Sequence, residues 1–413
     1  MSTKIPNPKR IGILGAGAAG YFVAARLNDL ENAEVVLLEK SSKPLQKVKI
    51  SGGGRCNLTH GEFDPKKLVE NYPRGNKELL SVFHTFQPQD AMSWFEEKGV
   101  PLKTEEDGRI FPKSDSSQSI VDALLKSASK STLLTQTKAE EILPEENGFW
   151  VLCGEKKFWF DYLFVCTGGT PSFYGVLEKL GHKMVPATAS LFTFVCQDKF
   201  VRSLMGISFE NASVTIPSLK LEQTGALLFT HWGFSGPGIL KLSSFGARSL
   251  AQIQYNFTLE VNFLNIDKED LTALFEEKKK SDPKKSVYAH SITPMPKRFW
   301  VGILQELKIP ENLNYSDLSK EKIQIICDKL CHGKFQIDGK STFKDEFVTC
   351  GGVEKKEINF KTMQSKLYPN MYFAGEIIDI DALTGGFNFQ AAWSGAYLAS
   401  GHLMEILKQE NRT

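Results

Sequence analysis

The chain has 413 residues, 41% of them hydrophobic, and its 50 basic and 48 acidic side chains leave a formal net charge of +2. A chain of this length buries a large core and is expected to form two or three domains. The balanced charge indicates neither nucleic acid nor a membrane surface as a partner, and no apolar run reaches the length of a membrane span. Since the N-terminus also lacks a signal-peptide core, we expect a soluble, cytoplasmic protein.

The cysteine pattern argues against disulfides and against a metal site. Seven cysteines at irregular spacing do not form a disulfide framework. Cys327 and Cys331 stand four positions apart with His332 next to them, but a zinc site needs further ligands and none occurs at a recognisable offset. We therefore expect this pair to be structural.

The N-terminal segment from Ile11 to Gly20 is typical of a strand, a glycine turn and the start of a helix. Gly15 permits the tight turn, Gly17 lets a pyrophosphate approach the backbone, and Gly20 lets the helix pack on the strand. A second strand-like run ends at Glu39, whose carboxylate suits ribose hydroxyls, and the diphosphate would lie on free helix amides. The predicted contacts with an adenine dinucleotide are Gly15, Ala16, Gly17, Ala18, Ala19, Gly20, Glu39 and Lys40.

A second glycine-rich segment follows at 51–57. Three consecutive glycines let the backbone approach a flat or charged ligand, and Arg55 with neighbouring N–H groups suits an anion. A flexible surface linker is the alternative, but the adjoining Arg, Cys and Asn favour a cofactor loop. Cys56 is either redox-active or a packing residue, and packing is favoured. The predicted cofactor contacts are Lys47, Ser51, Gly52, Gly53, Arg55, Cys56 and Asn57.

The C-terminal region supplies a third set of candidate contacts. Residues 372–379 predict a buried strand ending in a turn, and a glycine-containing segment at 384–390 leads into a helix of small residues at 391–399. Its N-terminal amides suit the electron-rich edge of a ligand. A ligand held near both chain ends must be long or must bring the ends together, and FAD does both. The predicted contacts are Gly375, Glu376, Asp379, Gly386, Asn388, Phe389, Gln390 and Ala391, with the two acids on ribityl hydroxyls rather than acting as bases.

Four motifs carry a resemblance to a known family. They are SGGGRCN at 51–57, CTGG at 166–169, FTHWGFSGP at 229–237, and AGEIID at 374–379 followed by TGGFN at 384–388. Together they resemble the BaiN/YhiN-type NAD(P)/FAD-dependent oxidoreductases, also described as aminoacetone oxidase family FAD-binding flavoproteins. The resemblance extends from Ile11 to about Leu403. It implies flavin redox chemistry on a fold of the glutathione-reductase-like two-dinucleotide-binding type, but it implies no substrate.

The expected fold is α/β, with a Rossmann-like FAD-binding domain formed by 1–187 and 345–413 and interrupted by an inserted domain at 188–344. Segments 132–142, 149–153 and 158–166 are strand-like. The last one ends in a turn of Thr167, Gly168 and Gly169, which we expect to return to the cofactor. Ala139 is placed near the adenine by analogy.

The insertion has a different pattern. Apolar and polar residues alternate through 188–265, which predicts a small β-barrel or sandwich, and 266–334 is largely helical. Segments 335–343 and 346–348 return as strands. His231, among aromatic and glycine residues, is a weak candidate for a proton donor, and the glycines around it suit a hinge equally well.

The sequence thus predicts an FAD-dependent oxidoreductase that transfers a hydride between flavin and a small organic substrate. A second complete GxGxxG unit is absent, so NAD(P)H either binds through the insertion or is not the reductant, and oxygen is the other candidate. The alternative is a flavin-binding protein with a non-redox, RNA-modifying or regulatory role. No nucleic acid, membrane or metal is expected as a partner, and the oligomeric state stays open.

Overall fold

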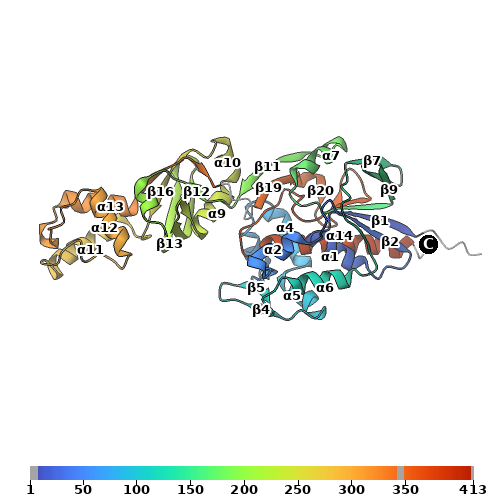
Figure 1. Cartoon of the computed structure of the whole chain (residues 1–413), viewed down its shortest axis with the longest axis horizontal. Helices are drawn as coiled ribbons and strands as arrows, with labels where there is room; N and C mark the ends of the chain where they lie inside the picture. The colour runs from blue at the N-terminus through green and yellow to red at the C-terminus, as the bar shows by residue number, and fades with distance from the viewer. Residues whose placement is uncertain (1–7, 342–347, 411–413) are drawn as a thin grey trace, which may run out of the picture. The chain divides into compact units, whose positions relative to one another are not determined.

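The computed structural model describes residues 8–341 and 348–410. The chain divides into two compact units (Figure 1). Unit 1 combines residues 1–187 with 349–413, and unit 2 comprises residues 188–348. Within the described residues, no helix is both long enough and apolar enough to cross a membrane.

Unit 1 is built on a seven-stranded sheet. Its strands, in spatial order, are β20 (Ile358–Asn359), β21 (Gln364–Ser365), β22 (Met371–Phe373), β10 (Tyr162–Val165), β1 (Lys9–Leu14), β2 (Ala33–Leu38) and β6 (Thr132–Leu134). The five strands from β22 to β6 pair in parallel. The last four residues of β1 and of β2 are buried, because a parallel sheet is covered on both faces.

The helices of unit 1 pack on this sheet, on the smaller sheets or on one another. They are α1 (Ala18–Leu27), α2 (Gln46–Gly54), α3 (Pro65–Val69), α4 (Asn76–Thr85), α5 (Pro88–Glu97), α6 (Gln118–Ser127), α7 (Tyr174–Lys179) and α14 (Phe387–Glu410). The first and last of them, α1 and α14, pack along each other, as Figure 1 shows. The Arg26 guanidinium on α1 lies 3.9 Å from the ring centre of Tyr397 on α14. The beginning and the end of the chain therefore share one layer of unit 1.

Three smaller sheets complete the unit. One contains β3 (Thr59–His60), β5 (Arg109–Pro112) and β4 (Leu102–Thr104), and another contains β7 (Glu141–Glu145), β8 (Gly148–Cys153) and β9 (Lys156–Phe160). The third pairs β11 (Met184–Ser190) with β19 (Val348–Val353). Both boundaries between the units fall within this pair of strands.

Three predicted strands are shorter than expected. The prediction of one strand over 132–142 is wrong, because β6 ends at Leu134 and β7 begins at Glu141. The run 158–166 is divided at Asp161, whose carboxylate accepts a 2.7 Å hydrogen bond from the Arg10 N–H. At 372–379 only the first two residues are in a strand, because β22 ends at Phe373. Apolar residues continue beyond Phe160 and Phe373, so the pattern alone overestimates these two strands, whereas β6 ends where the polar residues 135–138 begin.

Unit 2 contains a second seven-stranded sheet. The order is β17 (Gly333–Ile337), β16 (Phe257–Asn262), β13 (Ser208–Ile216), β14 (Leu221–Phe229), β15 (Gly233–Ser235), β12 (Phe194–Val195) and β18 (Gly339–Lys340). The two edge strands, β17 and β18, are separated only by Asp338, whose N–H donates to the Val195 carbonyl at 3.0 Å. One continuous segment thus pairs with both sides of the sheet, which closes it in the manner of a small barrel.

Helices of unit 2 pack on this sheet. They are α8 (Lys199–Ser203), α9 (Pro237–Phe245), α10 (Ala247–Gln252), α11 (Lys268–Ser281), α12 (Lys297–Glu306) and α13 (Lys320–Cys331). The core is rich in phenylalanine, and the rings of Phe209, Phe263 and Phe299 lie 4.7–5.3 Å apart in pairs. Of the strands expected at the end of the insertion, 342–343 and 346–347 lie outside the described residues.

We predict that Gly20→Ala destabilises unit 1 and that Gly175→Ala does not. A Cβ at Gly20 would lie 2.0 Å from the Gly15 carbonyl oxygen, so the expected loss in the free energy of unfolding is about 3 kcal/mol. A Cβ at Gly175, in α7, meets nothing within 4 Å, and that variant should gain about 0.5–1 kcal/mol. Denaturant unfolding of the cofactor-free protein measures both values. Equal stability of the two variants would contradict this packing.

Candidate functional site

The turn between β1 and α1 leaves room for a ligand at the helix N-terminus. Gly15 has a φ of +97°, and a Cβ there would lie 2.5 Å from the Cys166 carbonyl oxygen. Gly17 precedes the helix without a side-chain cap, and a Cβ on it would meet nothing within 4 Å. The N–H groups of Ala18, Ala19 and Gly20 begin the helix, where no intrahelical acceptor exists. Open space above uncapped amides suits an anion.

Glu39 follows β2 and lies against this turn. Its carboxylate accepts hydrogen bonds from the Ala16 N–H at 2.8 Å and from the Ser41 N–H at 2.8 Å. The carbonyl of Glu39 accepts from the Thr137 N–H at 2.8 Å, which brings the segment leading to the buried Ala139 alongside. Lys40 next to it is exposed. The Glu39 carboxylate thus stabilises the glycine turn by hydrogen bonding, a role that the sequence pattern did not predict.

The turn after β10, like Glu39, lies against the glycine turn. Gly15 is so close to Thr167 that a Cβ on it would approach the Thr167 Cα to 2.9 Å. The Thr167 hydroxyl is buried without a hydrogen-bond partner in the described part of the chain. Such a hydroxyl fits a ligand that bonds to it, because unpaired buried polar groups are costly.

Residues from three segments meet next to Gly168. The Lys47 Nζ forms an ion pair with the Glu376 Oε2 at 2.7 Å. A Cβ on Gly168 would lie 3.8 Å from that oxygen and 4.0 Å from the Lys47 nitrogen, and one on Gly169 would lie 3.5 Å from the Glu376 carbonyl oxygen. Predicted site residues 47, 168, 169 and 376 are therefore neighbours.

The second glycine segment ends α2 with a change of backbone conformation. Ser51 is extended, and Gly52, Gly53 and Gly54 have φ values of +56°, +67° and +85°. Cβ atoms on the last two would meet nothing within 4 Å, so these glycines face open space. Left-handed backbone over several residues is accessible to glycine at little cost.

Two side chains of this segment are engaged within the protein. The Arg55 guanidinium bonds to the Glu105 carboxylate at 2.6 Å and lies 4.1 Å from the ring centre of Phe111. Arg55 as an anion ligand therefore stays a prediction, and a ligand would compete with Glu105. Cys56 is fully buried, and burial raises the pKa of its thiol to about 12. A protonated, enclosed thiol agrees with a packing role.

The glycine segment and the C-terminal segment are directly connected. With its amide oriented to satisfy both neighbours, Asn57 accepts from the Gly386 N–H at 3.0 Å and donates to the Thr59 carbonyl at 3.0 Å. The Thr59 hydroxyl donates to the buried Gln390 amide at 2.5 Å. Predicted contacts from positions near 57 and near 390 therefore lie together.

The first helix, the last helix and the loop after β22 meet at Gly375. This residue has a φ of +80°, and a Cβ on it would lie 3.2 Å from Ala19 on α1 and 3.9 Å from Ala392 on α14. Helix α14 begins at Phe387, earlier than the sequence predicted, so residues 387–390 form its first turn, and the Gln390 N–H already donates to the Gly386 carbonyl at 3.0 Å. Small residues at this junction let both helix N-termini lie close to one loop.

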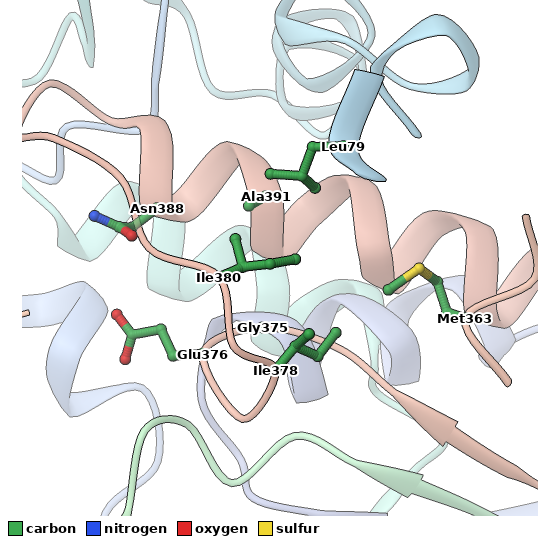
Figure 2. A pocket seen from close by; sticks show the side chains of 8 residues that line it. All are labelled: Leu79, Met363, Gly375, Glu376, Ile378, Ile380, Asn388 and Ala391. Atoms are coloured by element: carbon green, nitrogen blue, oxygen red, sulfur yellow. The ribbon is translucent and has the colours of Figure 1, made fainter. Parts of the chain in front are cut away.

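A pocket opens next to this junction (Figure 2). Gly375, Glu376, Asn388 and Ala391 line it, and the sequence had predicted all four as cofactor contacts. Figure 2 shows the polar ends of Asn388 and Glu376 toward one end of the pocket. The remaining lining residues, which the sequence analysis missed, are Leu79, Met363, Ile378 and Ile380. Ile378 could have been found from its place inside a motif, but Leu79 and Met363 come from segments without one.

The remaining predicted residues differ in exposure. Asp379 is 3% exposed and pairs with Lys355 at 3.5 Å, so its carboxylate belongs to the interior. The neighbouring Asp381 is fully buried in an ion pair with Arg74, which no sequence signal indicated. Phe389 stacks on Trp393 at 5.6 Å. His231 belongs to unit 2, where it is exposed in the turn between β14 and β15.

These features fit FAD. An uncapped helix N-terminus beneath an open glycine suits the diphosphate, Glu39 follows the second strand where a ribose would lie, and the Thr167 hydroxyl lacks a partner in the described chain. The second helix N-terminus, which begins at Phe387, lies beside a small pocket lined mainly by apolar side chains.

Residues 9–402 match the family described as HI0933-like protein Rossmann domain. A ribosomal RNA dihydrouridine synthase of Haemophilus influenzae is 32% identical over 93% of this chain and 96% of its own. The protein of that name from Escherichia coli is 29% identical over 95% and 97% of the two chains. A 3-dehydro-bile acid delta(4,6)-reductase of Clostridium scindens is 24% identical over 94% and 98%.

We predict that Gly17→Val yields a folded protein that retains no FAD. The side chain would occupy the open space above the amides of α1 without meeting protein atoms at its Cβ, so cofactor binding should fail while the fold persists. The visible absorption of the purified protein reports bound flavin, and circular dichroism reports the fold. A variant as yellow as the parent would show that the diphosphate lies elsewhere.

Because its cysteines are buried, we predict that the native protein reacts slowly with thiol reagents. All seven are buried, and burial raises the pKa of the Cys56 and Cys166 thiols to about 12. Since the thiolate is the reactive form, Ellman's reagent at pH 8 should titrate few thiols before denaturant is added and all seven afterwards. Rapid labelling of Cys56 in the native protein would instead indicate an accessible redox thiol.

Proposed function

Since the chain belongs to the HI0933-like family of Rossmann-fold, FAD-binding proteins, we propose that it is an FAD-dependent reductase of a carbon–carbon double bond conjugated to a carbonyl group. We further propose the uracil ring of ribosomal RNA as its substrate. The observation that carries the redox role is the convergence of glycine-lined segments from both chain ends on one open cradle next to an apolar pocket.

The names of the relatives support this reaction class. A dihydrouridine synthase adds two hydrogens across the ring double bond of uridine, which is conjugated to a ring carbonyl. The name 3-dehydro-bile acid delta(4,6)-reductase describes a steroid with a ketone at position 3 and reducible double bonds at positions 4 and 6. Both activities are reductions of this kind, and all three relatives match more than nine tenths of this chain. RNA is preferred as substrate because the relatives named for it are the more similar ones.

Bound flavin would supply hydride chemistry. The chain's own residues hold and tune it. The amides that begin α1 would bind the diphosphate, and Glu39 would bind the ribose in exchange for part of its present bonding to Ala16 and Ser41. The first turn of α14 would stabilise negative charge at the edge of the ring system, as an oxyanion hole does. The side chains of Leu79, Ile378 and Ile380 line the pocket with apolar atoms.

We propose NAD(P)H as the source of electrons. The sequence offers no second complete GxGxxG unit, so a nicotinamide would bind transiently rather than in a dedicated Rossmann domain. Bound FAD would relay the hydride of NAD(P)H to one carbon of the double bond, and a proton from solvent or protein would reach the other, so that NAD(P)⁺ and the reduced product balance the reaction.

The experiment is anaerobic. NADH and NADPH are mixed in turn with the FAD-loaded protein, and bleaching of the oxidised flavin band is followed. Ribosomal RNA or a conjugated ketosteroid is then added, and recovery of the band is measured together with dihydrouridine in the RNA. We expect bleaching by one nicotinamide and recovery with RNA.

Each outcome has a distinct meaning. Recovery with the ketosteroid alone would replace the substrate and keep the reaction class. If neither nicotinamide bleaches the flavin but dithionite-reduced protein still reduces RNA, only the electron source is wrong. If the reduced protein also transfers nothing, the non-redox alternative gains support.

A further inference from the structure

In unit 1, the loop that follows β22 pairs with the segment that precedes α4. Arg74 and Asp381 pair in an isolated antiparallel bridge, and their side chains form a buried ion pair. The Leu383 N–H donates to the Asn71 carbonyl at 2.9 Å, which extends the same pairing. Because separating the partners of a buried ion pair is costly, this pairing fixes the backbone at Asp381 and with it the preceding residue, Ile380.

The first turn of α14 holds the same loop. The Asn388 side-chain oxygen accepts from the Ala382 N–H at 3.0 Å, and the Asn388 side-chain nitrogen donates to the Ala382 carbonyl at 3.2 Å. Asn388 and Ile380 both line the pocket. The part of the wall that Ile380 contributes is therefore anchored by hydrogen bonds to α14 as well as by the ion pair.

A glycine provides the space in which Ile380 packs. Gly75 has a φ of +92°, and a Cβ on it would lie 2.6 Å from Cγ1 of Ile380 and 3.3 Å from its Cδ1. The Leu79 N–H donates to the Gly75 carbonyl at 2.8 Å, so this contact lies one helical turn before Leu79, another lining residue. The Ile380 side chain already touches the backbone at the start of α4, and it has no space to withdraw in that direction.

The Ile380 side chain limits the room in the pocket. It is 7% exposed, and Figure 2 shows it between the side chains of Leu79 and Ile378. Apolar walls offer a ligand no hydrogen bonds, so they discriminate between ligands by size and shape. A larger ligand would have to displace a side chain whose backbone is held on both sides.

We propose that Ile380 is a specificity-determining residue, which admits a single ring such as uracil to the pocket and excludes fused ring systems. This inference deepens the proposed function and rests on it, because it takes the reducible double bond to bind at this pocket. The Arg74–Asp381 ion pair and Gly75 act through Ile380, as positioning residues. Within the proposed reaction class, the size of this one side chain separates a pyrimidine substrate from a steroid.

Equilibrium dialysis of the FAD-loaded full chain, against uridine and against a four-ring steroid with a conjugated ketone, tests the proposal. For Ile380→Ala we expect the steroid affinity to rise about tenfold, because the removed atoms open the pocket, and the uridine affinity to change less than about threefold. The matched control is Ile120→Ala on α6, which removes the same atoms from a fully buried position that does not line the pocket. It should bind both ligands as the parent does.

Denaturant unfolding of the cofactor-free protein tests the contact itself. Gly75→Ala should lower the unfolding midpoint of the parent more than that of Ile380→Ala, because Ile380→Ala lacks the Cγ1 and Cδ1 atoms that the new Cβ would meet. Equal losses in the two backgrounds would show that Ile380 is free to move aside, and would contradict the proposal.

The outcomes separate this inference from the proposed function. If Ile380→Ala binds the steroid no better than the parent, or if no protein binds either ligand, Ile380 does not set the limit, even when the parent still forms dihydrouridine in ribosomal RNA. If the steroid affinity rises as expected but the dithionite-reduced protein reduces no ring, Ile380 keeps its role in binding and the proposed reaction fails. The flavin absorbance of each purified variant reports bound FAD, and loss of FAD from Ile380→Ala would assign this residue to cofactor binding instead.

Discussion

Unit 1 depends on a steric constraint, which is the close approach of the backbone at two glycines, one at the start of its first helix and one in the loop beside its first and last helices. Gly20 abuts the carbonyl of Gly15, and Gly375 lies between Ala19 and Ala392. These contacts allow α1 and α14 to approach the same loop. Because the backbone lies so close there, both helix N-termini reach one cradle, and the ligand contacts expected there come mainly from main-chain amides.

A site made of amides binds a cofactor firmly but does little to select a substrate. Amides at helix ends recognise phosphate or an electron-rich ring edge in many proteins, whatever the reaction. Selectivity must therefore arise from side chains, which here means those that line the pocket. This division explains why membership of a family identifies the cofactor more readily than the substrate.

The sequence predicted the parts of the structure that depend on local chemistry. Glycine at positions 15, 17 and 20 has a steric meaning that neighbouring residues do not alter, and the Rossmann-like FAD-binding fold expected from it is confirmed. Strand ends were less predictable, because apolar residues continue past Phe373 where the ladder stops.

Long-range pairs escaped prediction for a different reason. Arg74 and Asp381 form a buried ion pair, and neither lies in a sequence motif that indicates the other. Glu39 was expected to face a ribose, whereas it also braces the turn through Ala16. Such contacts depend on which segments the fold brings together, and periodicity along a single chain carries no information about that.

The interrupted order of unit 1 has a consequence for biosynthesis. Strand β10 ends at Val165, but its parallel neighbour β22 begins at Met371. At about 5–20 residues per second, a ribosome needs roughly 10–40 seconds to deliver the missing strand. During that interval the edge of β10 in the nascent sheet has no partner strand. The whole of unit 2 emerges in the same interval and can fold into its barrel. The intervening domain therefore folds in a window when its host is incomplete, and chaperones that shield open sheet edges would act on the host half.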